Sequence, residues 1–156
     1  MCTRLYKEIA MEYRKETGAY YIRIDPGEDV METIVKVCEE NHVFGGSFQG
    51  IGACGEAVLS TYLPTTKEFQ DHVLTGMLEM ASLTGNVTKA ADGKIGIHAH
   101  AVFSYLDGQK ISTVGGHLTK AIVSYTGEIV LRSSESPIGQ RDDLVPGVNV
   151  WDLGRK

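Results

Sequence analysis

Three histidines in the middle of the chain have the spacing expected of a metal site. His98 and His100 lie in the segment GIHAHAVF, and residues two apart in a β-strand project from one face about 6.6 Å apart. The Asp107-Gly108 pair that follows is typical of a two-residue hairpin turn. With these two residues at the centre of the turn, His98 pairs with His117. Directly opposed residues of antiparallel strands project to the same face, so we expect three imidazoles on one patch.

Three imidazoles that converge could hold a divalent metal ion. Imidazole nitrogen suits zinc and other first-row metals, and three histidines leave a fourth position for water or another group. We therefore expect a divalent metal at His98, His100 and His117, with zinc favoured. The alternative stays open, because a single histidine is more often an ordinary surface or core residue. In addition, a β-bulge at Gly115-Gly116 would turn His117 elsewhere.

Two glutamates are weaker candidates for chemistry beside such a metal. Glu56 and Glu79 could move a proton at a metal-bound water or support the ligands, although most glutamates of this kind are simply solvated. The segment GIGACG matches G-x-G-x-x-G, but a dinucleotide site needs a helix to begin there, and the following EAVLSTYLP is typical of a strand. We expect no nucleotide cofactor, and the sequence leaves open whether the protein is an enzyme.

One principal helix is predicted over residues 27–41. Asp25 could cap it, Pro26 suits the first helical position, and Glu28 could reach back to the cap. Its expected buried face follows the helical period and consists of Val30, Ile34, Val37 and Cys38.

From Gly45 to about Glu135 the sequence consists of short β-type runs separated by glycine, Asp-Gly and proline. Seven runs in about ninety residues favour an antiparallel sheet that carries a helix over alternating β-α-β units. The fold class that we predict is α+β, mainly an antiparallel β-sheet with one principal helix. We expect residues 137–156 to form an extended tail docked through Leu144, Val148, Val150 and Trp151.

Length and composition indicate a single domain over residues 1–156. Hydrophobic residues make up 42% of the 156 residues, which suits one globular core. No segment is long and apolar enough to span a membrane, and the first residues lack a signal-peptide pattern, so we expect a cytoplasmic protein without a membrane partner. The formal net charge of −5 and the scattered basic residues disfavour nucleic acid as a partner.

Several segments, taken together, resemble the PPC domain, which is conserved in plants and prokaryotes. The resemblance covers about residues 14–134. It is carried by the joint order of Gly27-Glu28-Asp29, Thr84-Gly85, His98-x-His100 and Gly115-Gly116-His117-Leu118. It implies an α+β domain with an antiparallel sheet that assembles as a homotrimer.

The same resemblance suggests DNA as a partner, but this sequence lacks the segment with which the plant relatives bind DNA. Single-domain prokaryotic members are labelled candidate DNA-binding proteins by analogy with plant relatives, whose AT-hook has an Arg-Gly-Arg-Pro core. This sequence contains no such tract. The plant domain also has a Gly-Arg-Phe-Glu-Ile-Leu segment linked to partner contacts. Here Gly76 and Glu79 match, but Met77 replaces the arginine, so partner selection does not carry over unchanged.

Two functions of different classes remain. The first is a homotrimeric binding or regulatory module of the PPC type with a three-histidine metal site. The alternative is a metal-dependent enzyme or small-molecule-binding protein that uses the same histidines and does not bind DNA.

Overall fold

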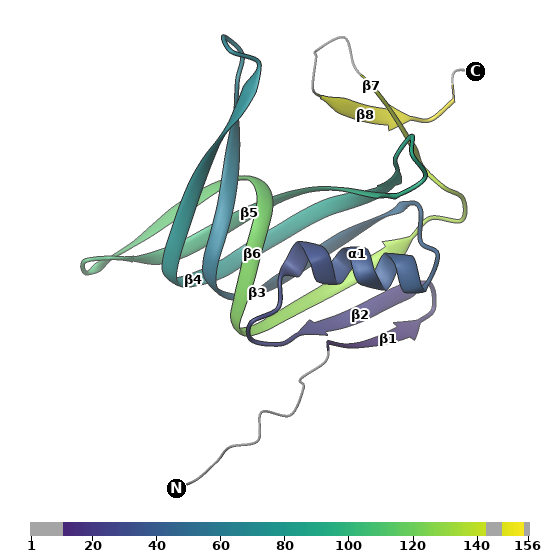
Figure 1. Ribbon diagram of the computed structural model, residues 1–156. Helices are drawn as coiled ribbons and strands as arrows, with labels where there is room; N and C mark the ends of the chain where they lie inside the picture. The colour runs from purple at the N-terminus through teal and green to yellow at the C-terminus, as the bar shows by residue number, and fades with distance from the viewer. Residues whose placement is uncertain (1–10, 143–147, 155–156) are drawn as a thin grey trace, which may run out of the picture.

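The computed structural model describes residues 11–142 and 148–154. Within them lie one α-helix and eight β-strands (Figure 1). In chain order these are β1 (Glu12–Glu16), β2 (Ala19–Ile24), α1 (Val30–Glu40), β3 (Gly46–Leu63), β4 (Glu68–Lys89), β5 (Ile95–Asp107), β6 (Lys110–Ser133), β7 (Gly139–Asp142) and β8 (Asn149–Asp152). The predicted α+β class, mainly antiparallel sheet with one helix, is confirmed.

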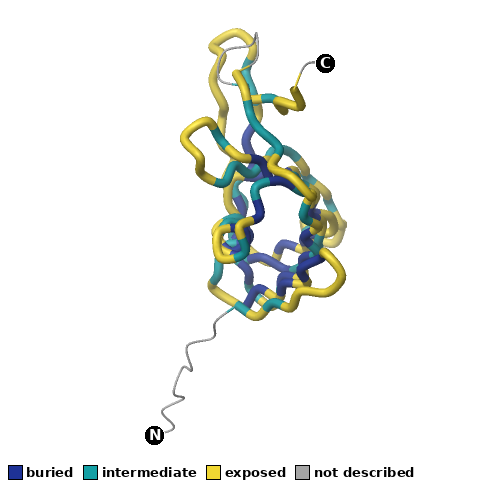
Figure 2. The backbone as a smooth tube through the Cα atoms, turned by 90° about the vertical axis from the view of Figure 1, so that its right-hand side faces the viewer, coloured by how far each residue is buried: buried dark blue, intermediate teal, exposed yellow. Residues whose placement is uncertain are grey.

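Four long strands form a closed ring of antiparallel pairs. β3 pairs with β4, β4 with β5, β5 with β6, and β6 again with β3. β2 also pairs with β6, and β1 with β2, which extends the sheet beyond the ring. Buried parts of the chain gather around the interior of this arrangement (Figure 2), and the buried apolar side chains of the sheet and α1 form one cluster.

The strands are longer and fewer than the sequence pattern suggested. The predicted runs GSFQGIGA (46–53) and EAVLSTYLP (56–64) form one strand, β3. The runs EFQDHVLTG (68–76) and MLEMASLTGNVT (77–88) form one strand, β4. β-bulges between Gly50 and Gly52 and between Cys54 and Glu56 bend β3 without ending it. A Cβ on Gly52 would lie 2.5 Å from the carbonyl oxygen of Thr126, so this glycine permits close contact between strands and does not form a turn.

The helix begins later than predicted. Its N-cap is Asp29, whose Oδ1 accepts hydrogen bonds from the backbone N–H groups of Met31 and Glu32 at 2.8 and 2.9 Å. Glu28 does reach back to the N–H of Asp25, at 2.8 Å, but this bond closes a turn before the helix. The expected apolar face, Val30, Ile34, Val37 and Cys38, is fully buried.

The start of α1 lies against the part of β6 between its pairings with β5 and β2. β6 pairs with β5 through residues 110–117 and with β2 through residues 127–132, and between these stretches the segment that leads into α1 exchanges backbone hydrogen bonds with Val123. Asp29 Oδ2 accepts a hydrogen bond from the backbone N–H of Ala121 at 3.2 Å, so the cap also fastens the helix to β6. Among the described residues, this one helix is too short to cross a membrane.

The C-terminal segment differs from the docked extended tail that we expected. β7 and β8 form an antiparallel hairpin, and β7 meets β4 in parallel at Lys89 and Gly139. Trp151 is 49% exposed and Val148 and Val150 are half-buried, because the hairpin projects from the body and covers little of it (Figure 1). Leu144 lies outside the described residues.

Candidate metal centre

The hairpin of β5 and β6 brings the three histidines to one face, with a pairing that differs from the predicted one. Asp107 pairs with Lys110, so Gly108 and Gln109 form the turn, and Gly108 has φ +63°, as a type II′ turn requires. His117 therefore opposes His100, and the predicted pairing with His98 is wrong. The shift is two residues, and side chains alternate with a period of two, so the face is preserved.

The glycine pair before His117 does not disturb this register. Gly115 and Gly116 pair regularly with Val102 and Ala101 of β5, without the bulge that would have moved His117 away.

The three imidazoles lie against one another. Their ring centroids are 5.2 Å apart for His98 and His100, 5.0 Å for His98 and His117, and 5.6 Å for His100 and His117. One nitrogen from each ring lies within 4.8 Å of the other two. Tetrahedral zinc with bonds of 2.0–2.1 Å holds its ligands about 3.4 Å apart, so small ring rotations would bring these nitrogens into place.

The cluster lies where two strands diverge. β5 and β6 are paired from their turn as far as His100 and His117, and from His117 onward β6 pairs with β3. His98 lies two residues beyond the last β5–β6 pair, on the same face of β5 as His100. An ion held by all three rings would therefore join the strands at this fork.

The surroundings of the histidines favour their neutral form. Partial burial lowers the pKa of His98, and the nearby His100 lowers it further. Partial burial also lowers the pKa of His117, with further contributions from His98 and His100. Neutral imidazole is the form that ligates a metal, so these shifts keep two of the three ligands ready at neutral pH.

Side chains that sequence reasoning did not include surround the cluster. The ring of Phe69, at the tip of the β3–β4 hairpin, lies 5.6 Å from the ring of His117. Asn86 of β4 pairs with His98, and Trp151 Nε1 donates to Asn86 Oδ1 at 3.3 Å. Asn86 directly follows the Thr84-Gly85 motif, but only the β4–β5 register shows that it faces a histidine.

The two glutamates are not members of this cluster. Glu56 accepts a hydrogen bond from Lys120 Nζ at 2.8 Å, and the pair lies on the β3–β6 ladder beyond the histidines. Glu79 lines a separate hollow of about 380 Å³ with residues of β3 and β6. Their roles in catalysis stay predictions.

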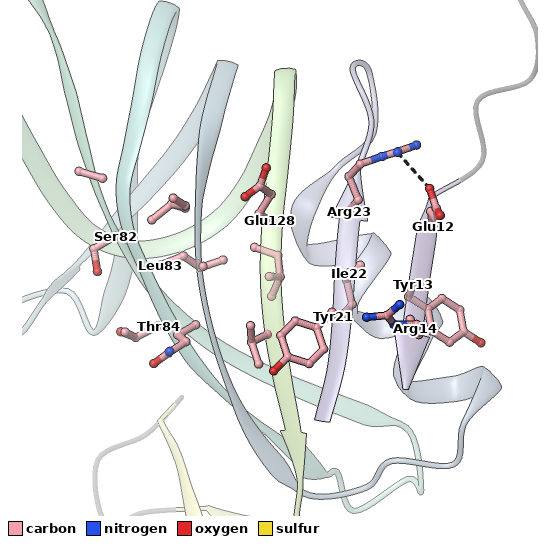
Figure 3. A pocket seen from close by; sticks show the side chains of 16 residues that line it. Glu12, Tyr13, Arg14, Tyr21, Ile22, Arg23, Ser82, Leu83, Thr84 and Glu128 are labelled. Carbon is pink, nitrogen blue, oxygen red and sulfur yellow. Dashed lines mark ion pairs between the residues drawn. The ribbon is translucent and has the colours of Figure 1, made fainter. Parts of the chain in front are cut away.

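Two pockets adjoin on the outer face of the sheet. The larger, of about 800 Å³, runs across β1, β2, β6, β3 and β4, and Figure 3 shows Arg23 and Glu12 paired at one side of it. The smaller, of about 580 Å³, is lined by His98, His100 and Trp151, and the two share Thr84. The smaller pocket includes two members of the histidine cluster, so a ligand in it would lie beside the candidate metal ligands.

Fold and site together define a β-rich α+β domain with a cluster of potential metal ligands on the outer face of its sheet. Residues 11–135 match the Plants and Prokaryotes Conserved (PCC or PPC) domain, and the chain belongs to this family. The predicted resemblance over residues 14–134 is confirmed.

Solved structures of related proteins support the same assignment. A candidate DNA-binding protein of Bacteroides thetaiotaomicron is 28% identical, with a TM-score of 0.86 over 93% of this chain and 99% of that one. A candidate DNA-binding protein of Ralstonia eutropha is 28% identical, with a TM-score of 0.83 over 91% of this chain and 96% of that one. A metal-containing protein of Archaeoglobus fulgidus is 30% identical, with a TM-score of 0.76 over 91% of this chain and 97% of that one. No protein of curated function matches significantly.

Proposed function

We propose that this protein is a metal-binding module of the PCC family in which His98, His100 and His117 hold one divalent ion. The observation that carries the proposal is the approach of three ring nitrogens to within 4.8 Å of one another. The similarity to the metal-containing protein of A. fulgidus supports it.

Zinc is the ion that we favour. An all-imidazole donor set suits zinc, and three protein ligands leave the fourth tetrahedral position open. The lowered pKa values of His98 and His117 reduce competition from protons at neutral pH.

Assembly and location form a second part of the proposal. We propose that the protein assembles as a homotrimer, on the basis of the family resemblance, and that it is cytoplasmic, on the basis of the sequence pattern. Tyr21, labelled in Figure 3, and Ile51 both line the larger pocket and are 50% and 56% exposed. We assign the contact between subunits to this face. Light scattering on Ile51→Lys should show loss of the trimer, whereas a monomeric wild type would contradict this part.

DNA is the less favoured partner. The names of two similar proteins suggest it. However, the formal net charge of −5 opposes approach to phosphates, and the sequence lacks an AT-hook. We therefore propose a binding module that acts without DNA.

An enzyme or small-molecule-binding protein is the second candidate function. The pocket of about 580 Å³ beside His98 and His100 favours it, because a ligand there would meet the open position of the ion. A bound zinc would supply a Lewis acid that polarises an oxygen ligand or a water.

Elemental analysis after removal of the metal and reloading with zinc tests the main proposal. The wild type should retain one zinc per chain, and His98→Ala and His117→Ala should lose it. Loss of an outer partner typically costs 10–100-fold in metal affinity, so loss of a direct ligand should cost more than about 100-fold. His72→Ala is the matched control, because His72 is exposed on β4 and outside the cluster. Equal zinc content in all four proteins would refute the ligand set.

A further inference from the structure

A row of polar side chains leads across four strands from the histidine cluster to an arginine. Arg132 of β6 pairs with Ser47 of β3, Ser47 pairs with Asn86 of β4, and Asn86 pairs with His98 of β5. Directly opposed residues of antiparallel strands project to the same face. The row therefore presents a guanidinium, a hydroxyl, an amide and an imidazole side by side on the outer face of the sheet.

A pocket lies over this row. It has a volume of about 580 Å³ and is lined by all four members of the row. The indole of Trp151, carried by β8, lines the same pocket and donates to Asn86 Oδ1 at 3.3 Å. The C-terminal hairpin thus contributes an aromatic wall, and half of that side chain is left exposed for a ligand to contact.

The two ends of the pocket both suit an anionic oxygen. Arg132 lines the pocket, and no carboxylate among residues 11–142 and 148–154 forms an ion pair with it. A guanidinium matches the two oxygens of a carboxylate in a bidentate pair. At the other end, an ion held by three histidines would keep one position for an oxygen ligand.

The distance between these ends selects the class of ligand. Three strand spacings of about 4.8 Å place the Cα atoms of Arg132 and His98 about 14 Å apart. Side chains stand roughly perpendicular to a sheet, so a ligand with an anionic group at each end spans these two groups better than one small anion does. The row contains a single cation and two neutral hydrogen-bonding groups, which fits a singly charged carboxylate better than a phosphate dianion.

We propose that this pocket binds a small dicarboxylate. One carboxylate coordinates the metal held by the histidine cluster, and the other pairs with Arg132. Ser47 and Asn86 donate hydrogen bonds to carboxylate oxygens, and the indole of Trp151 covers the apolar chain between the two carboxylates. This inference rests on the proposed metal site and adds the chemical class of its ligand.

Trp151 is the only tryptophan of the chain, so its fluorescence reports on the pocket directly. Adipate titrated into the zinc-loaded protein should change this fluorescence to saturation. Hexanoate, of equal chain length but with one carboxylate, and adipate added to Arg132→Gln should each bind about tenfold more weakly or worse, because each removes a charge-assisted contact. Arg14→Gln is the matched control, since Arg14 pairs with Glu16 and lies outside this pocket, and it should respond as the wild type does.

Zinc content, measured on the same samples, separates the two levels of the proposal. Zinc-loaded protein that gives no response to adipate, or an equal response in Arg132→Gln, would overturn the dicarboxylate inference and leave the metal site standing. A wild type that retains no zinc would overturn the proposed function and this inference with it. A response that survives removal of the zinc would also refute the bridging arrangement.

Discussion

At the scale of single residues, the protonation of the histidines controls the metal site. Partial burial and the proximity of the rings lower the pKa of His98 and of His117 below the ordinary value of 6.5. Each ring therefore stays neutral to a lower pH in the folded protein than in the unfolded chain. Between the lowered pKa of the folded protein and the ordinary pKa of the unfolded chain, the folded state binds fewer protons than the unfolded state. The contribution of these histidines to the free energy of unfolding is therefore present above about pH 6.5 and is lost as the pH falls below it.

Zinc binding should also weaken as the pH falls. We expect full zinc occupancy at pH 7 and progressive release as the pH falls below about 6.5, because protonated imidazole cannot bind a metal. Dialysis at a series of pH values followed by zinc analysis measures this, and His72→Ala should give the same curve as the wild type. Zinc content that does not change between pH 7 and pH 4 would show that the histidines are not the ligands.

Gly85 is a second residue whose role can be tested alone. A Cβ at this position would clash with the ring of Phe48 and lie 2.6 Å from the carbonyl oxygen of His98. Gly85→Ala should lower the free energy of unfolding by about 1–3 kcal/mol, the usual cost of overpacking. Urea denaturation measures this. Gly55→Ala is the control, because its Cβ would meet only Ser124 Cβ at 3.7 Å. Equal losses of unfolding free energy in both variants would contradict the close contact of Gly85 with Phe48 and the backbone of His98.

At the scale of elements, the cap of α1 links the helix to the sheet. Asp29 accepts two hydrogen bonds at the helix start and a third from Ala121 of β6. Asp29→Ala should therefore lower the free energy of unfolding by about 2 kcal/mol, at the upper end for a helix cap, since a part-buried N–H also loses its partner.

Asp29→Asn separates the hydrogen bonds from the charge. Asparagine keeps a cap acceptor, so this variant should lose clearly less stability than Asp29→Ala in the same urea denaturation. Equal losses would show that the cap hydrogen bonds contribute little.

The elements also show how far sequence reasoning reaches. The helical period identified the buried face of α1 correctly, because packing repeats every 3.6 residues regardless of where the helix starts. The start itself was predicted too early, because Asp25-Pro26 and Glu28 form a capping-type turn without starting a helix. For Gly50 and Gly52 the sequence left open a tight hairpin or a close backbone contact, and the structure shows the close contact, since a glycine that permits a bulge and one that permits a turn look alike in a sequence.

The histidine cluster was predictable for a related reason. Moving the turn from Asp107-Gly108 to Gly108-Gln109 changes each pairing by two residues, and this returns His117 to the same face. The contribution of Trp151 was not predictable in the same way. The hydrogen bond from Trp151 of β8 to Asn86 of β4 joins residues 65 apart in the chain, for which no local pattern exists.

At the scale of the whole molecule, the charge balance argues against DNA as the partner. Neutralising phosphates takes basic residues, and the chain has 15 of them against 20 acidic ones. We expect no shift of an AT-rich duplex in a gel-shift assay at physiological salt, and at most a weak shift at low salt. A shift that persists at physiological salt would contradict this and favour the function named for the similar proteins.

Within the closed ring of strands, the proposed metal lies where β6 changes its pairing partner. β6 pairs with β5 on one side of His117 and with β3 from His117 onward, so the cluster lies where the chain passes from one partner to the next. The central claim is that one ion joins β5 and β6 at this fork.

Anomalous scattering at the zinc absorption edge, from crystals of the zinc-loaded protein, tests that claim most directly. We predict one strong peak per chain, about 2.0–2.1 Å from a ring nitrogen of each of His98, His100 and His117. Zinc-loaded crystals with no peak at these three rings, or with a peak bound by other residues, would contradict it.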